Sequence, residues 1–316
     1  MFEDSEAASI DYKSGQFLTF VFPKENGGQD RRSYSISSAP VLHEPLQVTV
    51  RRVPNGIYSR WFIDHAKEGD ALQTTGATGF FVLPDDMRAY DQLIFFAAGS
   101  GITPVFSLIK TVLNSHTHVK IVLLYSNAAA ATTIFWDELH ALQHKFPLRL
   151  TIEFLFSAAR RRLNVGMIEQ VAKRYSTRSL FYLCGPAEYM RTITIVLRTS
   201  GITDGAIHRE IFHIEKPAIK ELPPDGLPHA VRLVWAGKEY AFTVQYPVTI
   251  LQAAKQLDIQ VPFSCEAGQC GTCAATCVAG KVWMWHNDVL MDEELSAGRV
   301  LTCTGYPVEG DVRLEY

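Results

Sequence analysis

The most informative stretch of this chain reads Cys265-Glu-Ala-Gly-Gln-Cys270-Gly-Thr-Cys273, and Cys303 follows after 29 intervening residues. This C-x4-C-x2-C…C array has the spacing by which four thiolates hold a 2Fe-2S cluster. Two glycines lie inside the loop, where a backbone that wraps around inorganic sulfide leaves little room for side chains. The alternatives are a structural zinc site or disulfides, but zinc sites usually combine two C-x2-C pairs. The array therefore predicts an iron-sulfur centre.

Composition narrows the class of protein further. The 316 residues are 47% hydrophobic and 20% charged, which is enough chain for two or three domains with their own cores. A net charge of -3 and a pI near 6.4 indicate no nucleic-acid partner, and no apolar run is long enough to span a bilayer. The acidic N-terminus lacks a signal-peptide pattern. Because thiolate ligands need a reducing setting, we expect a cytoplasmic protein.

Short apolar runs broken by Gly and Pro occupy the first ninety residues. Gln16-Phe-Leu-Thr-Phe-Val-Phe22 and Leu46-Gln-Val-Thr-Val-Arg51 are two of them, and they predict strands of an antiparallel barrel. Only ten residues precede Asp11.

A different pattern follows the barrel. Strand-like runs alternate with helical stretches, which is typical of a parallel doubly wound sheet, and the runs lie at 93–98, 120–126, 150–157 and 179–184. Between the first two, the spacing of Val105, Leu108, Ile109 and Val112 predicts a helix packed on one face. Cys277, at an alternating position after the cysteine loop, is expected to be a buried strand residue.

A Pro- and charge-rich segment then separates the parallel domain from the cysteine array, and its composition predicts a linker of restricted flexibility. The expected organisation is a flavin-binding barrel at 1–90, a nicotinamide-binding α/β domain at 91–213, a linker at 214–229 and an iron-sulfur domain at 230–316.

The flavin prediction begins from two short motifs. Arg32-Ser-Tyr34-Ser35 closes a strand-like stretch, and Gly56-Ile-Tyr-Ser59 opens a short helix. A guanidinium suits a pyrophosphate, an aromatic ring suits a flat isoalloxazine, a serine can bond the flavin N5 edge, and a helix start at Ser59 would take a phosphate oxygen. A strand arginine, a core tyrosine and a helix cap are the structural alternatives.

Two further motifs follow strands of the parallel domain. Gly99-Ser-Gly101-Ile-Thr103-Pro104 lies where a buried strand turns into a helix, so its amides and the helix dipole suit a dinucleotide pyrophosphate. Thr103 also suits a helix cap and Pro104 a first helical turn. Cys184-Gly185-Pro186 is predicted to end the last strand of the sheet, at the edge where such folds bind ligands. A buried strand-end cysteine is the alternative for Cys184.

Taken together, R-x-Y-S, G-x-x-S, G-x-G-I-T-P and C-G-P resemble the ferredoxin-NADP reductase superfamily. Pro262-Phe-Ser-Cys265 and Val300-Leu-Thr-Cys303 resemble plant-type ferredoxins over residues 230–316. From Gly15 onward the order of motifs is similar to oxygenase reductase components such as phenylacetyl-CoA epoxidase reductase. The resemblance implies an antiparallel barrel, a parallel α/β domain and an α+β ferredoxin domain of the β-grasp type.

The resemblance also implies roles for single residues. It places Arg32 and Ser59 at the flavin phosphates, Tyr34 and Ser35 at the ring, and Cys184 beside nicotinamide C4. In a closing strand that resembles the family's, the acidic Glu210 and the aromatic Phe212 would approach the flavin; a surface carboxylate and a core phenylalanine are the alternatives.

The chain departs from the family in two places. His213 stands where relatives commonly have glycine, and the short N-terminal segment leaves the barrel without the first strand that relatives carry. FAD is the expected flavin, and FMN is the alternative.

The nicotinamide donor is left open between NADH and NADPH, because Asn127-Ala-Ala-Ala-Ala131 lacks the arginine of many relatives whereas Arg160-Arg-Arg162 follows the next strand. That triple could also be a solvated turn. The predicted reaction is hydride transfer to flavin followed by single-electron transfer through the cluster to a protein partner, an oxygenase component. A stand-alone flavin reductase (diaphorase) and a non-catalytic electron carrier are the alternatives.

Overall fold

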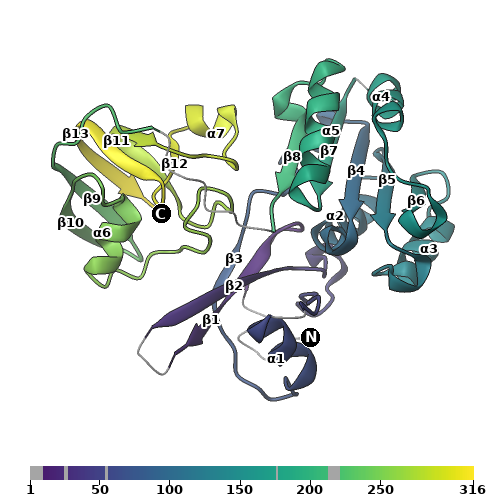
Figure 1. Cartoon of the computed structure of the whole chain (residues 1–316), viewed down its shortest axis with the longest axis horizontal. Coiled ribbons are helices and arrows are strands. Elements are labelled where there is room, and N and C mark those ends of the chain that lie inside the picture. Colours follow the sequence, from purple (N-terminus) through teal and green to yellow (C-terminus); the bar gives the residue numbers. More distant parts are fainter. Residues whose placement is uncertain (1–9, 25–27, 54–55, 176, 213–220) are drawn as a thin grey trace. The chain divides into compact units, whose positions relative to one another are not determined.

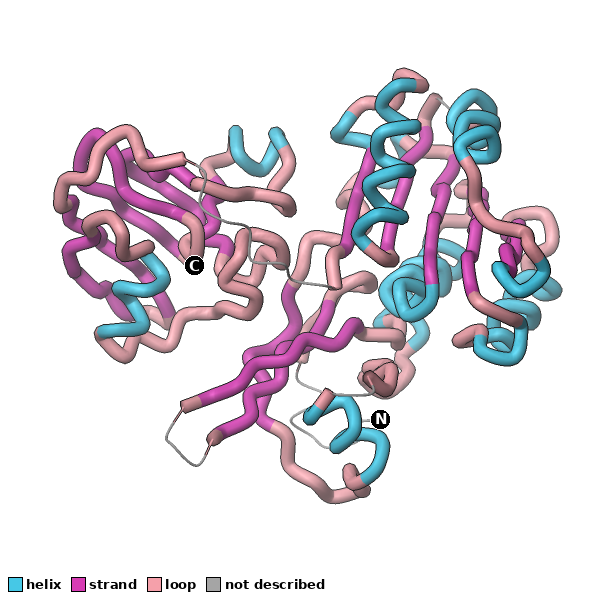
Figure 2. The backbone as a smooth tube through the Cα atoms, in the orientation of Figure 1, coloured by secondary structure: helices cyan, strands magenta, loops and turns pink. Residues whose placement is uncertain are grey.

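The structure is a computed structural model that describes residues 10–24, 28–53, 56–175, 177–212 and 221–316. The chain forms two compact units, Met1–His213 and Ile214–Tyr316, and each is described by itself. Figure 1 labels their helices and strands, and Figure 2 distinguishes helix, strand and loop along the backbone. Within the described ranges, no helix is both long and apolar enough to cross a membrane.

The first unit begins with an antiparallel sheet. Its strands, in the order β2-β1-β3, are β1 (Phe17–Pro23), β2 (Gln29–Ser35) and β3 (Gln73–Thr78). Alternate residues of β1, Leu18 and Phe20, are buried and pack with Ile36 and Leu46. The alternation arises because successive side chains of a strand point to opposite faces. The antiparallel architecture expected for the first domain is confirmed, whereas the expected loss of a first strand falls on residues 1–9, outside the described part.

The sequence predicts a strand at 46–51, and this prediction is wrong. That segment pairs only through an isolated bridge between Ile36 and Val48. The amide of Gln47 donates to the side-chain oxygen of Ser38 (3.0 Å) instead of to a backbone carbonyl, which interrupts the ladder. Two short helices flank this region, α1 (Ile57–Asp64) and the 3-10 turn η2 (Pro40–Leu42).

A parallel sheet follows in the same unit. Its strands, in the order β6-β5-β4-β7-β8, are β4 (Gln92–Ala98), β5 (Lys120–Asn127), β6 (Leu150–Phe156), β7 (Ser179–Cys184) and β8 (Ile207–Glu210). Four of them match the predicted runs, because strands covered on both faces are almost continuously apolar. The sequence predicts that β7 is the last strand, which is wrong: β8 pairs parallel to β7 and forms the edge.

Helices cover both faces of the parallel sheet, as Figure 2 shows. They are α2 (Ile102–Ser115), α3 (Trp136–Lys145), α4 (Val165–Arg174) and α5 (Ala187–Thr199). Residues of α2 and α3 join one buried cluster and residues of α4 and α5 join the other. The predicted helix face of Val105, Leu108, Ile109 and Val112 is confirmed, since all four are fully buried. The remaining 3-10 turns are η3 (Met87–Ala89), η4 (Gly99–Gly101), η5 (Ala130–Thr132), η6 (Ser157–Ala159) and η7 (Asp204–Ala206).

The second unit is an α+β domain with a mixed sheet. Its elements are β9 (His229–Trp235), β10 (Lys238–Val244), α6 (Ile250–Gln256), β11 (Ala274–Met284), α7 (Asp292–Ser296), β12 (Arg299–Leu301) and β13 (Gly305–Glu315). The strand order is β10-β9-β13-β11-β12, in which β13 runs parallel to β9 and the other pairs are antiparallel. Helix α6 starts with a capping box between Thr249 and Gln252 and buries its apolar side.

Cys277 lies on β11, as the sequence predicts, but it is only partly buried. The register of β11 against β13 shifts between Cys277 and Ala279, so the side chain leaves the regular inward alternation.

Candidate functional site

A cleft of about 760 Å³ lies in the first unit, where the loops after β4, β5, β6 and β7 meet. These are the carboxyl ends of neighbouring parallel strands, where open α/β sheets bind their ligands. Arg51, from the antiparallel part, and Phe212, after β8, also line the cleft. A volume of this size suits a ligand larger than a single ring.

The loop after β4 forms one wall of the cleft. It is the turn η4, Gly99–Gly101, which leads directly into α2. Gly99 has a left-handed φ of +55°, and Tyr125 donates a hydrogen bond to its carbonyl oxygen (3.0 Å). A side chain at Gly101 would bring a Cβ within 2.1 Å of the Cys184 carbonyl oxygen, so this close contact with β7 requires glycine.

Two residues of the same motif have structural tasks. Pro104 lies in the first turn of α2, where its missing N–H costs nothing. Thr103 was open to a cap role, but the residue that caps α2 is Gly101, and the Thr103 hydroxyl donates to the Ser100 carbonyl (3.0 Å).

The loop after β7 forms the opposite wall. Gly185 and Pro186 line the cleft, and a Cβ at Gly185 would lie 2.9 Å from the Cβ of Ala98. Cys184 itself is fully buried between Ala97 and Glu210 in the sheet register. Burial, together with the charge of Glu210, raises the pKa of its thiol well above the usual value, so Cys184 is a neutral thiol at pH 7.

Glu210 and Phe212 take opposite positions at the end of the sheet. Glu210 is 8% exposed, and burial raises its pKa to about 8, so the alternative of a surface carboxylate is wrong. Phe212 is 43% exposed and lines the cleft, so it is not a core residue. His213, whose departure from the family is noted above, lies outside the described residues.

The predicted flavin motif lies on β2. Ser35 ends the strand and is buried, while Tyr34 packs edge-on against Phe62 (5.2 Å between ring centroids). The guanidinium of Arg32 lies 5.0 Å from the centre of the Tyr58 ring, whose hydroxyl donates to Asp30 (2.7 Å).

The second flavin motif begins one turn earlier than the sequence predicts. Helix α1 starts at Ile57 with Gly56 as its cap, so Ser59 is in the first turn and is not the helix start. The buried Ser59 hydroxyl accepts a hydrogen bond from the Val53 amide (3.2 Å), which ties the helix to the preceding segment. A side chain at Gly56 would lie 2.5 Å from that hydroxyl oxygen.

The cysteine loop has its amides turned toward sulfur. The backbone amides of Ala267 and Gln269 donate to the Cys265 sulfur (3.4 and 3.5 Å), and the Cys265 amide donates to the Cys270 sulfur (3.5 Å). Hydrogen bonds from Cys270, Cys303 and these amides lower the pKa of Cys265. Four thiols with amide donors are the chemistry that a 2Fe-2S cluster needs, so the residues fit that group.

The four thiols differ in exposure. Cys265, Cys273 and Cys303 are buried, and Cys270 is partly exposed. Gly268, in the same loop, has a φ of +71°, and a Cβ there would lie 2.6 Å from the His286 carbonyl oxygen. All six cysteines are free thiols, so the disulfide alternative is wrong.

Sequence reasoning missed some of the residues that the fold brings to the cleft. Arg51 approaches the glycine loop, since a Cβ at Gly99 would lie 3.6 Å from its guanidinium. Tyr189 on α5 lines the cleft and donates to the Ala97 carbonyl (3.2 Å). Their only sequence signal is a charge or an aromatic ring outside any motif. Of the arginine triple, Arg162 lines the cleft.

Three family descriptions match consecutive parts of the chain. They are an oxidoreductase FAD-binding domain at residues 2–83, an oxidoreductase NAD-binding domain at 95–194 and a 2Fe-2S iron-sulfur cluster binding domain at 233–308. The ferredoxin reductase component of 3-ketosteroid-9-alpha-monooxygenase from Rhodococcus rhodochrous is 32% identical over 96% of this chain and 88% of that protein. The chain belongs to the family of oxygenase reductase components.

Two further similarities agree with this assignment. The 1,2-phenylacetyl-CoA epoxidase of Escherichia coli (strain K12) contains a polypeptide that is 28% identical over 96% of the reductase and 88% of that polypeptide. The solved structure of phthalate dioxygenase reductase, described as modular for electron transfer from pyridine nucleotides to [2Fe-2S], aligns with a TM-score of 0.60 and 24% identity. The alignment covers 99% of the reductase and 91% of that chain, which shows the same three-domain fold.

The reductase is therefore an NAD(P)H-dependent oxidoreductase with FAD and a 2Fe-2S centre, and it delivers electrons to an oxygenase component. The predicted resemblance to phenylacetyl-CoA epoxidase reductase and its relatives is confirmed. Because the three domains together span nearly the whole chain, the match favours a reductase component over a stand-alone diaphorase or a non-catalytic carrier.

Proposed function

We propose that the nicotinamide dinucleotide binds in the cleft with its pyrophosphate against Gly99–Gly101 and the N-terminus of α2. The turn is held close to β7 by Gly101, and the 14-residue helix behind it presents a positive dipole end. Arg51 adds a full charge beside the same turn. Gly185 and Pro186 would face the nicotinamide end, with Phe212 as a movable cover because it is half exposed.

The proposed flavin site is built around the end of β2. Arg32 and Ser59 would contact the phosphates, with Gly56 leaving room at the start of α1, while Tyr34 and Ser35 would flank the ring. Glu210, a buried carboxyl with a pKa of about 8, would hold a proton near Cys184 at neutral pH. Bound FAD supplies the chemistry that takes up a hydride and releases single electrons.

The four cysteines of the array are proposed as the cluster ligands. The amides of Ala267 and Gln269 would continue to donate to the Cys265 thiolate, and Cys270 would mark the edge through which electrons leave because it is the least buried of the four. We propose a Rieske or di-iron oxygenase component as the acceptor and a cytoplasmic location, because thiolate ligands need a reducing setting.

The domain limits are also part of this proposal: 1–90, 91–213, 214–229 and 230–316. Support comes from the division of the chain between His213 and Ile214 and from the order of the three family matches. Residues 213–220 of the proposed linker lie outside the described part.

The preferred donor depends on Arg162 in this proposal. Arg161 is bound to Glu153 (2.8 Å), whereas Arg162 turns toward the cleft after β6. A guanidinium there is suited to the 2'-phosphate of NADPH, and we propose NADPH as the better donor.

The observation that carries the function is the four-thiol loop in one chain with the glycine-lined cleft. The test compares Cys270→Ser with the matched control Cys277→Ser in the reconstituted holoprotein. We expect Cys270→Ser to lose the cluster absorption and at least tenfold of cytochrome c reduction, while NAD(P)H still bleaches the flavin at the wild-type rate. Cys277→Ser should retain all three properties. Equal cytochrome c reduction by both variants would contradict the proposed route and favour a diaphorase.

A further inference from the structure

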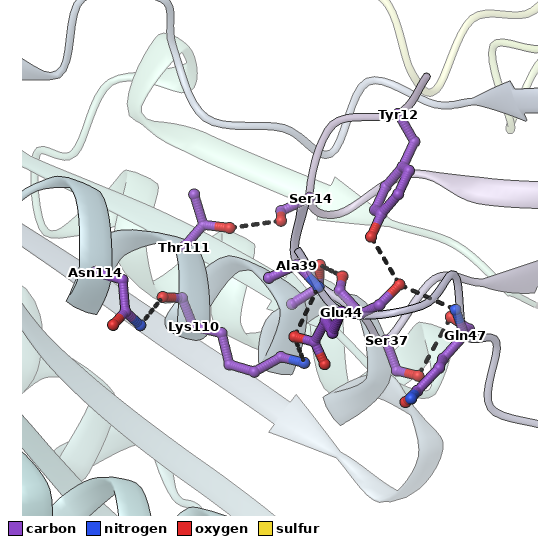
Figure 3. A network of polar contacts seen from close by, with 11 residues as sticks. Tyr12, Ser14, Ser37, Ala39, Glu44, Gln47, Lys110, Thr111 and Asn114 are labelled. Carbon is purple, nitrogen blue, oxygen red and sulfur yellow. Dashed lines mark hydrogen bonds and ion pairs between the residues drawn. The ribbon is translucent and has the colours of Figure 1, made fainter. Parts of the chain in front are cut away.

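A buried ion pair joins the antiparallel domain to the middle of α2. Lys110 is 7% exposed although it lies in an otherwise apolar helix, and its ammonium contacts the Glu44 carboxylate at 2.5 Å. The same carboxylate oxygen accepts a hydrogen bond from the Ala39 amide (3.1 Å). Figure 3 shows Glu44 between the helix and the segment that follows β2. One carboxylate therefore contacts both elements.

Neighbouring polar groups form a network around this pair (Figure 3). The buried Ser107 hydroxyl donates to the Ser38 carbonyl (2.5 Å), and Ser14 and Thr111 share a hydrogen bond (2.6 Å). The Ser38 side chain in turn accepts from the Tyr12 hydroxyl (2.8 Å). Three side chains on one face of α2, at positions 107, 110 and 111, thus contact the antiparallel domain.

The network connects the two proposed binding elements. Ser38 lies three residues after Ser35, which is proposed to contact the flavin ring, and α2 begins at the turn proposed to bind the dinucleotide. A helix transmits a shift of one end to the other because its backbone bonds are satisfied internally. Hydride transfer needs the reacting atoms about 3–3.5 Å apart, so the relative position of these two elements sets the rate.

A directional ion pair can fix this position better than an apolar contact. Apolar side chains of similar volume would pack as well and would avoid the cost of removing two charges from water. They would also tolerate sliding of α2 along the segment at 36–39, because dispersion contacts have little directional preference. The pair at Lys110 and Glu44 adds bonds of defined direction to both partners.

We propose that Lys110 and Glu44 are positioning residues for hydride transfer, which hold the flavin-edge segment and the dinucleotide-binding helix in register. This inference rests on the proposed function of the cleft. It assigns to the pair an effect on the rate of flavin reduction, beyond an effect on folding.

The test uses the FAD- and cluster-loaded holoprotein and measures the limiting rate of flavin bleaching by NADPH and by NADH in anaerobic stopped flow. Lys110→Met and Glu44→Gln are expected to lower that rate by about 10- to 100-fold, because a misplacement of about 1 Å costs on the order of 10²-fold. The apparent dissociation constant of the donor should stay within threefold. Lys110→Arg should restore the rate to within threefold of the wild type.

The matched control is Lys13→Met, which breaks the exposed ion pair between Lys13 and Asp85 (3.1 Å; 64% and 95% exposed side chains) and should leave the rate unchanged. Wild-type limiting rates in both Lys110→Met and Glu44→Gln would overturn the inference, even if the melting temperature falls. If Lys110→Met does not fold, Glu44→Gln alone decides, since it keeps an oxygen for the Ala39 amide. Failure of both donors to bleach the wild-type flavin would instead reject the proposed function.

Discussion

Replacement of Gly101 by alanine tests the cleft most directly. The φ of Gly101 is an ordinary helical −62°, so alanine adds no backbone strain there. The added Cβ would instead lie 2.1 Å from the Cys184 carbonyl oxygen and 2.9 Å from the Gly185 amide nitrogen. Ordinary contacts of this kind begin near 3.4 Å, so the turn and the end of β7 must separate by roughly 1 Å.

That separation moves the two walls of the proposed nicotinamide site apart. A misplacement of about 1 Å costs on the order of 10²-fold in rate, and overpacking costs about 1–3 kcal/mol of stability. We therefore expect Gly101→Ala to slow flavin bleaching by NADPH about 100-fold in stopped flow, with a small fall in melting temperature.

The matched control is Gly166→Ala in α4. Its added Cβ would lie no closer than 3.4 Å to the Asn164 side chain. Because alanine favours the helix, this variant should gain about 0.4–1 kcal/mol and bleach at the wild-type rate. A rate for Gly101→Ala within twofold of the control would refute the assignment of this turn to the dinucleotide.

Three further variants test other parts of the molecule. Because the pKa of Glu210 is about 8 in the folded protein and 4.5 for an ordinary glutamate, stability should fall as the pH rises from about 4.5 to 8, by about 5 kcal/mol in total. Glu210→Gln should flatten the melting temperature across that range, and an unchanged slope would show that another group titrates. Arg162→Ser should raise the KM for NADPH about tenfold (about 1.4 kcal/mol) and leave that for NADH within twofold; equal changes would exclude a 2'-phosphate contact. Gly268→Ala should lower the iron content at least severalfold, because its Cβ would meet the His286 carbonyl at 2.6 Å, whereas Gly237→Ala, with a similar φ (+73° against +71°) and open space, should load normally. Equal loading of the two would show that the loop tolerates the side chain.

Much of the fold is visible in local patterns. Runs of apolar residues identify four strands of the parallel sheet because strands buried on both faces exclude polar side chains. The errors occur where contacts across the sheet decide the outcome. The segment at 46–51 has strand composition, but Ser38 takes up the Gln47 amide, and Cys277 leaves the inward alternation at a shift of register.

The candidate site divides in the same way. The motifs at Gly99–Gly101 and at Gly185 are visible because close backbone contacts restrict the residue type to glycine. The burial of Glu210 and the exposure of Phe212 are not, since neighbouring residues of a closing strand differ only in what packs over them.

By itself, the sequence determined the chemistry of this reductase: four thiols at cluster spacing, a glycine turn between strand and helix, and three domains in order. These are local constraints, set by bond geometry and by side-chain size over a few residues. Only the tertiary structure brought Arg51 and Arg162 to one cleft and paired Lys110 with Glu44 across 66 residues of chain. Such contacts depend on how separate elements pack, and packing is a property of the whole domain.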